Sequence, residues 1–111
     1  MYDERLAERV RAVLSPRVDV TERKMFGGLA FMVGEKMACG VVGEELMVRL
    51  GPDGAEAALE EPHVRPMDFT GRPMTGMVFV APAGLRARAL DRRVAQAVSF
   101  VRTLPAKPAK R

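Results

Sequence analysis

The sequence predicts an α+β fold, in which helices pack against a mainly antiparallel sheet within a single domain. Two observations lead to this prediction. Apolar residues recur at helical spacing near both ends of the chain, whereas glycine and proline divide the segment between them into short apolar stretches. The expected order of elements is α-β-β-β-α-β-β-α. The 111 residues fit one domain, which at this size buries enough surface to fold without a metal or a disulfide.

The first helix is predicted to follow Asp3, because a short acidic side chain suits the N-cap position. An apolar stripe with helical spacing supports this helix and consists of Leu6, Val10, Val13 and Leu14. Pro16 ends the helix, since the residue before a proline avoids the helical conformation. Residues 17–24 are rich in charge and are expected to form a connector.

The central segment is predicted to form an antiparallel meander of three strands, at residues 29–33, 36–42 and 45–50. The dipeptides Gly34-Glu35 and Gly43-Glu44 separate these strands, and short turns with glycine first are typical of tight hairpins. The third strand has the clearest pattern, because aliphatic residues occupy every second position.

The second half of the chain is predicted to contain two more strands between two helices. Asp53 is expected to cap a short helix at residues 55–61, and the strands are expected at residues 64–69 and 77–81. Residues 70–76 are expected to be irregular because they contain two glycines and a proline. The last helix is supported by an apolar stripe of Leu90, Val94, Ala97, Val98 and Val101.

The net charge of +4 is divided unevenly along the chain. Residues 1–84 carry 10 basic and 13 acidic side chains, a net of −3, whereas residues 85–111 carry 8 basic side chains and one acidic one, a net of +7. Such arginines most often form a solvated helix face, but this basic end leaves open sequence-independent binding of nucleic acid through its phosphates. The candidate contacts are Arg92, Arg93, Arg102, Lys107 and Lys110.

Residue types that support catalysis or metal binding are scarce. The chain has one cysteine, Cys39, and one histidine, His63, so neither an internal disulfide nor a zinc cluster is expected. Cys39 is expected to be a buried strand residue, and His63 is expected to lie in a solvated loop. The longest apolar stretch, residues 25–33, is too short to cross a membrane, and acids stand near the start of the chain. We therefore expect a cytoplasmic protein with no enzymatic activity, cofactor, metal or membrane contact.

Seven methionines follow Met1, and their positions divide them into two groups. Those within predicted strands are expected to fill the core of a chain that has no tryptophan. Met25, Met67 and Met74 flank irregular segments instead, and they are the better candidates for a contact surface.

Several short segments together resemble one known family. They are residues 23–32 (RKMFGGLAFM), residues 46–49 (LMVR) and residues 67–74 (MDFTGRPM). Together with residues 100–105 they closely resemble the N-terminal domain of the TfoX/Sxy family. The resemblance covers about residues 3–105, so residues 1–105 are taken as the domain and residues 106–111 as a basic tail, which is expected to be disordered.

The resemblance implies a compact α/β domain with a regulatory or protein-interaction function. In the proteins that give the family its name, this domain precedes a helical domain, which we expect to be absent from this chain. Those proteins act as positive regulators of natural competence genes alongside a cAMP-responsive activator. No catalytic residues come with the resemblance. The leading hypothesis is therefore a non-enzymatic transcription or competence co-regulator, monomeric or homodimeric, whose partner is another protein such as a transcription factor.

The shared segments also contain a candidate patch of basic residues, Arg23, Lys24, Arg49 and Arg72. If these side chains converge on one face, Asp68 can pair with them in a structural cluster. Left open, they can instead bind an anion or a partner. A small-ligand protein that uses this patch for an anion is thus a third possible function.

Overall fold

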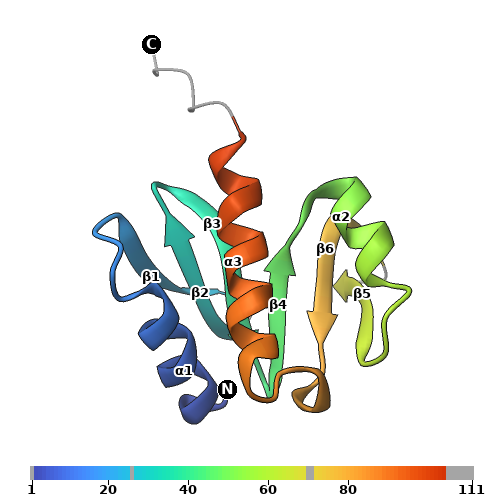
Figure 1. Ribbon diagram of the computed structural model, residues 1–111, viewed down its shortest axis with the longest axis horizontal. Helices are drawn as coiled ribbons and strands as arrows, with labels where there is room; N and C mark the ends of the chain where they lie inside the picture. Colours follow the sequence, from blue (N-terminus) through green and yellow to red (C-terminus); the bar gives the residue numbers. More distant parts are fainter. Residues whose placement is uncertain (1, 26, 70–71, 105–111) are drawn as a thin grey trace.

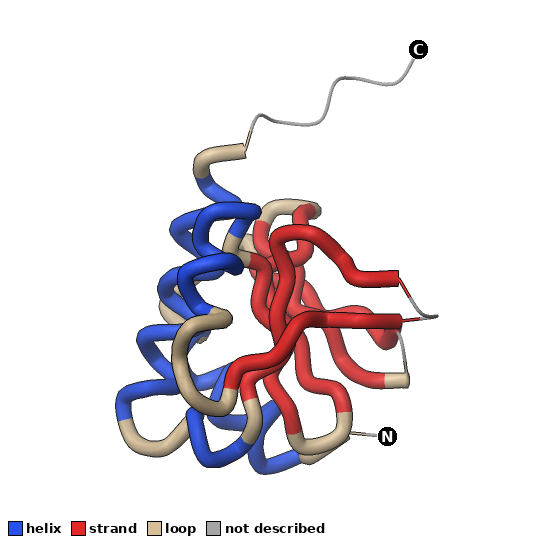
Figure 2. The backbone as a smooth tube through the Cα atoms, turned by 90° about the vertical axis from the view of Figure 1, so that its right-hand side faces the viewer, coloured by secondary structure: helices blue, strands red, loops and turns tan. Residues whose placement is uncertain are grey.

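Within the residues that the computed structural model describes, the strands form one six-stranded sheet, and three helices lie against one of its faces (Figures 1 and 2). The structure describes residues 2–25, 27–69 and 72–104, with the backbone alone for residues 68, 69 and 72–75. Neighbouring strands of the sheet are all antiparallel, which confirms the expected α+β class. The proposed tail, residues 106–111, lies outside the described residues.

The sheet contains one strand more than the sequence predicts. In chain order the elements are α1 (Glu4–Leu14), β1 (Val20–Met25), β2 (Gly28–Val33), β3 (Lys36–Val42), β4 (Glu45–Arg49), α2 (Gly51–Ala58), β5 (Val64–Phe69), β6 (Arg72–Val80), the short 3₁₀ helix η1 (Pro82–Gly84) and α3 (Arg88–Arg102). The order across the sheet is β1-β2-β3-β4-β6-β5, so β2, β3 and β4 form the expected meander and β6 lies between β4 and β5.

α1 begins where its sequence predicts. The Asp3 carboxylate accepts hydrogen bonds from the backbone N–H groups of Arg5 and Leu6, at 2.9 and 3.3 Å, and so satisfies two donors of the first turn. The predicted apolar stripe faces the sheet, with Leu6, Val10 and Leu14 buried.

β1 corrects the prediction of a charged connector at residues 17–24. It pairs with β2 along its whole length, from Val20 opposite Val33 to Met25 opposite Gly28. β1 is an edge strand, and its four inner residues are exposed on both faces. Such a strand needs no alternation of apolar and polar residues, so the pattern that indicated the other strands is missing here.

Two boundaries in the second half also differ from expectation. α2 begins at Gly51, and Asp53 lies in its first turn, whereas the N-cap residue Leu50 makes no side-chain hydrogen bond. β6 begins at Arg72, inside the segment expected to be irregular. Pro73 fits this strand because β4 pairs only with residues 77–80 of β6, so at Pro73 the described ladder lies on the β5 side alone.

Each face of the sheet carries its own core. Successive strand residues point to opposite faces, so in β4 Leu46 and Val48 pack under the helices while Met47 packs on the far side. The far-side cluster consists of Met47, Met67, Met77 and Phe79, all buried. Burial of Met47 and Met77 confirms the core role expected for these two strand methionines, whereas Met32 and Met37, expected in the core as well, are half-buried. The prediction of Met67 as a surface residue is wrong, because it is fully buried.

α3 is the longest helix in the described part of the chain, at 15 residues, and it is rich in arginine. Within that part, no helix combines the length and the apolar character needed to cross a membrane.

Candidate functional site

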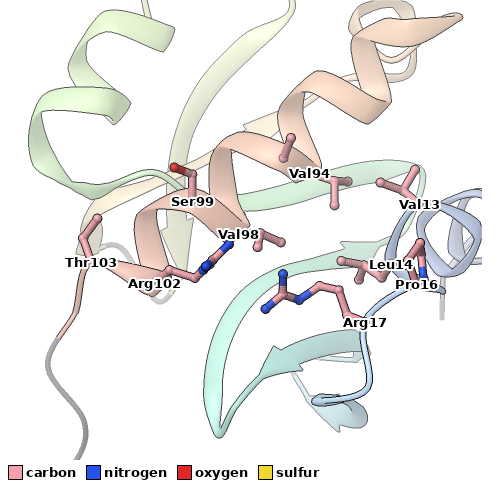
Figure 3. A pocket seen from close by; sticks show the side chains of 10 residues that line it. Val13, Leu14, Pro16, Arg17, Val94, Val98, Ser99, Arg102 and Thr103 are labelled. Carbon is pink, nitrogen blue, oxygen red and sulfur yellow. The ribbon is translucent and has the colours of Figure 1, made fainter.

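α3 lies between α1 and α2 over the sheet, and a groove runs along each of its sides (Figure 1). The first, called here the α1–α3 groove, has a volume of about 600 Å³ (Figure 3). Its walls come from the end of α1 with the following turn and from the second half of α3. The lining residues are Val13, Leu14, Pro16, Arg17, Val94, Ala95, Val98, Ser99, Arg102 and Thr103.

Two arginines face each other across the α1–α3 groove (Figure 3). Arg17 Nη2 donates to Asp19 Oδ2 at 3.3 Å, while its buried Nε lies 3.3 Å from Asp19 Oδ1 without the alignment of a hydrogen bond. The exposed Arg102 has no hydrogen-bond or ion-pair partner among the residues that the structure describes. The groove therefore combines an apolar floor with two cations whose hydrogen-bonding capacity is incompletely used.

The second groove, called here the α2–α3 groove, has a volume of about 540 Å³. Arg93 lies in its wall with only 4% of its surface exposed. Its Nη2 donates to Glu61 Oε1 at 2.5 Å and its Nη1 to Gln96 Oε1 at 3.3 Å, which places an ion pair between α3 and the segment after α2. Ser99 lines both grooves and is exposed, so a ligand in either one would lie near it.

The predicted patch does not form a single basic face. Arg23 and Lys24 are consecutive residues of the exposed strand β1, so their side chains point to opposite faces of the sheet. Arg49 belongs to β4, which two strands separate from β1, a distance of about 14 Å at ordinary strand spacing. The side chains of Arg72 and Asp68 lie outside what the structure describes.

Arg49 has a local role at the end of β4. Its Nη1 donates to the Met37 carbonyl at 3.4 Å, and its guanidinium carbon lies 5.9 Å from the centre of the Phe100 ring. This geometry links the sheet to α3 by a cation–π contact.

The candidate nucleic-acid contacts are also divided. Arg92 and Arg102 are exposed on α3, as expected for side chains that meet phosphate. Arg93 is instead buried and paired with Glu61, so it is not available to a nucleic acid, and its assignment as a contact is wrong. Lys107 and Lys110 lie outside the described residues.

Cys39 and His63, the sequence's one cysteine and one histidine, lie in different environments. Cys39 is a free, fully buried thiol in β3, and burial alone raises its pKa to about 12. His63 is exposed in the turn before β5, as expected. The described residues contain no group of three or more histidines, cysteines and acids that could hold a metal ion.

Sequence reasoning missed Arg17, which it placed in a connector. A usable indication is its position directly after the Ser15-Pro16 helix stop, which fixes the residue at the end of α1. The sequence also contains an indication that Arg93 is buried. Arg93 stands three residues after Leu90 and four before Ala97, so it falls on the buried face of α3 rather than outside it.

Comparison with known proteins identifies the family of this chain. Searches among curated proteins and among solved structures gave no match. The family described as the TfoX N-terminal domain matches residues 12–101. This range includes all residues that line the α1–α3 groove except Arg102 and Thr103. Because this match covers most of the 111 residues, the chain belongs to the TfoX N-terminal domain family.

Proposed function

We propose that this chain is a non-enzymatic regulatory domain that acts by binding another protein through α3 and the grooves beside it. The observation that supports this proposal most directly is the placement of α3, whose exposed side is flanked by grooves of about 600 and 540 Å³. Membership of the TfoX N-terminal domain family supports a role in transcription or competence regulation, with a transcription factor as one class of partner. The buried, weakly acidic thiol of Cys39 is consistent with a structural rather than a catalytic role.

In-cell photo-crosslinking tests this proposal. A photoreactive residue replaces Ser99, which is exposed and lines both grooves, and a second one replaces Glu35, which is exposed in the turn between β2 and β3. We expect a defined protein adduct from position 99 and not from position 35, together with altered transcript levels when the gene is deleted. Absence of a specific adduct at position 99 combined with unchanged transcripts would contradict the proposal.

A second candidate function, nucleic-acid binding, is favoured by a separate observation. Arg86, Arg88, Arg92 and Arg102 are all exposed on or just before α3. This function predicts an affinity that falls steeply with salt and that decreases when Arg88 and Arg92 are replaced by alanine. Binding that is undetectable at about 50 mM salt, or that is indifferent to these substitutions, would remove this candidate.

A further inference from the structure

The α1–α3 groove has the properties of a site for one kind of protein segment. Its floor is apolar and includes the buried side chains of Leu14 and Val94 with the half-buried Val98. A volume of about 600 Å³ is enough for several side chains of a ligand. The floor therefore favours an aliphatic group, which a purely ionic ligand does not supply.

The charges at the rim specify the sign of the ligand. Arg17 on the α1 side and Arg102 on the α3 side point toward each other across the groove (Figure 3). Two guanidinium groups in this arrangement repel each other, and Asp19 neutralises only the first of them among the described residues. A carboxylate placed between them would relieve the repulsion and accept hydrogen bonds from both.

One exposed apolar residue follows the groove residue Arg17 in the chain. Val18 follows Arg17 in the same turn and is completely exposed, at 101% of its reference surface. Only one other large apolar residue in the described part of the chain, Leu59, is classed as exposed, and it lies after α2. A peptide segment that lies in the groove and continues past Arg17 would gain contact with Val18, which a metabolite confined to the groove would not.

The walls of the groove are held in place by polar contacts outside it. Arg9 of α1 donates from Nη2 to the Leu85 carbonyl at 2.7 Å, just before α3. Arg11 of the same helix donates to Glu22 of β1 at 2.7 Å. These contacts fix α1 relative to α3 and to the sheet, so little ordering is needed when a ligand binds.

We propose that the α1–α3 groove binds an acidic amphipathic segment of a partner protein. An aliphatic side chain of that segment lies on Val94 and Val98, and a carboxylate lies between Arg17 and Arg102. This inference rests on the proposed function, since it names the chemistry of the partner that α3 would recognise.

A binding measurement with designed peptides tests the inference. The probe is a fluorescent peptide of about 16 residues. In its helical form, leucine and glutamate occupy successive turns of one face. One companion peptide has glutamine in place of glutamate, and another has serine in place of leucine. We expect the 111-residue chain to bind the probe in fluorescence anisotropy and to bind each companion at least about tenfold more weakly.

Charge-reversal variants place the site on the molecule. Arg17→Glu and Arg102→Glu are each expected to weaken probe binding about tenfold. Arg5→Glu makes the same charge change at the exposed start of α1, outside the lining of both grooves, and is expected to change affinity less than about twofold. Unchanged circular dichroism and melting temperature in each variant show that the fold is retained.

Other occupants of the groove give distinct results. Equal affinity for the glutamine or serine peptide overturns the inference, and so does equal weakening by Arg5→Glu. If the peptides do not bind, but the chain self-associates and Arg102→Glu abolishes this self-association, the inference is overturned. The occupant of the groove is then a second copy of the chain. If the peptides fail but an adduct still forms from position 99 in cells, the inference is wrong while the proposed function stands.

Discussion

Arg93 shows how one residue changes role when its surroundings are known. Its position on the basic last helix suggests a phosphate contact, yet 96% of its surface is buried and Glu61 and Gln96 accept from its guanidinium. Its Nε makes no hydrogen bond in the described part of the chain. A buried guanidinium is costly unless its charge is paired, so the Glu61 carboxylate is the group that allows Arg93 to stay where it is.

Removing that carboxylate is expected to destabilise the fold. Glu61→Ala leaves the buried charge with Gln96 as its remaining partner and should lower the free energy of unfolding by about 1–3 kcal/mol, since the Glu61 side chain is itself half exposed. Arg93→Met in the same chain removes the unpaired charge and keeps most of the volume, so the double variant should recover stability. Urea denaturation measures both.

The control for this pair is Glu60→Ala, an exposed acid next to Glu61. It should change the free energy of unfolding by less than about 0.5 kcal/mol. A double variant less stable than Glu61→Ala alone would contradict the assignment of Arg93 as a costly charge held by its partner.

At the scale of elements, the junction of β4, α2 and α3 depends on one glycine. Gly51 begins α2 with φ of +81°, and a Cβ at this position would overlap three atoms of the Phe100 ring on α3. Gly43, in the turn between β3 and β4, has φ of +58° but open space where a Cβ would be. The two positions therefore separate backbone strain from steric overlap.

Substituting alanine at the two glycines should have unequal effects. Gly43→Ala introduces backbone strain alone and should cost about 1–2 kcal/mol of unfolding free energy. Gly51→Ala adds the clash with Phe100 and should cost about 2–5 kcal/mol in all. Phe100→Leu combined with Gly51→Ala should recover part of the loss in thermal or urea unfolding. Equal costs at the two glycines would rule out close packing of Phe100 as the reason for Gly51.

The contact between α1 and β1 gives the stability a defined dependence on pH. The hydrogen bond from Arg11 lowers the pKa of Glu22 below its usual value, so the folded protein releases this proton more readily than the unfolded chain. The pair therefore stabilises the fold above the ordinary glutamate pKa of about 4.3. That contribution is lost as the pH falls through the lowered pKa.

Glu22→Gln should reveal this dependence. The variant is expected to be about 0.5–1 kcal/mol less stable than the parent chain at pH 7, because the pair is partly exposed, and this difference should shrink as the pH falls through the lowered pKa of Glu22. Glu8→Gln is the matched control. Glu8 bonds the same arginine but is 71% exposed, and its replacement should cost less than about 0.5 kcal/mol. A Glu22→Gln deficit that persists at low pH would contradict an ionic origin.

Elements with a buried face could be predicted from the sequence, and elements without one could not. α1, β2, β3, β4 and α3 each bury a regular set of apolar residues, so periodicity indicates them. β1 is held by backbone hydrogen bonds to β2 and exposes most of its side chains, so its residues carry no such pattern. The α1–α3 groove also escaped prediction, since it joins Arg17 and Arg102, 85 positions apart, through the packing of two helices.

At the scale of the whole molecule, one sheet joins two cores. The helical face contributes the larger core, and the far face contributes the cluster of Met47, Met67, Met77 and Phe79. β4 and β6 supply residues to both, because alternate side chains of each strand point to opposite faces. Neither core can open without distorting strands that hold the other, so the domain is expected to unfold as one cooperative unit.

The far-side core therefore provides a test of that cooperativity. Met67→Ala removes a fully buried side chain and should lower the free energy of unfolding by about 2–5 kcal/mol, whereas Met25→Ala, half-buried on β1, should cost about 1 kcal/mol or less. The reactivity of Cys39 provides an independent measure of unfolding. Burial raises the pKa of this thiol to about 12 and keeps a thiol reagent from reacting with it until the sheet opens. In Met67→Ala, unfolding followed by circular dichroism and by Cys39 reactivity should coincide at a lower denaturant concentration. Two separate transitions would show instead that the far-side core can melt while Cys39 stays buried beneath the helices.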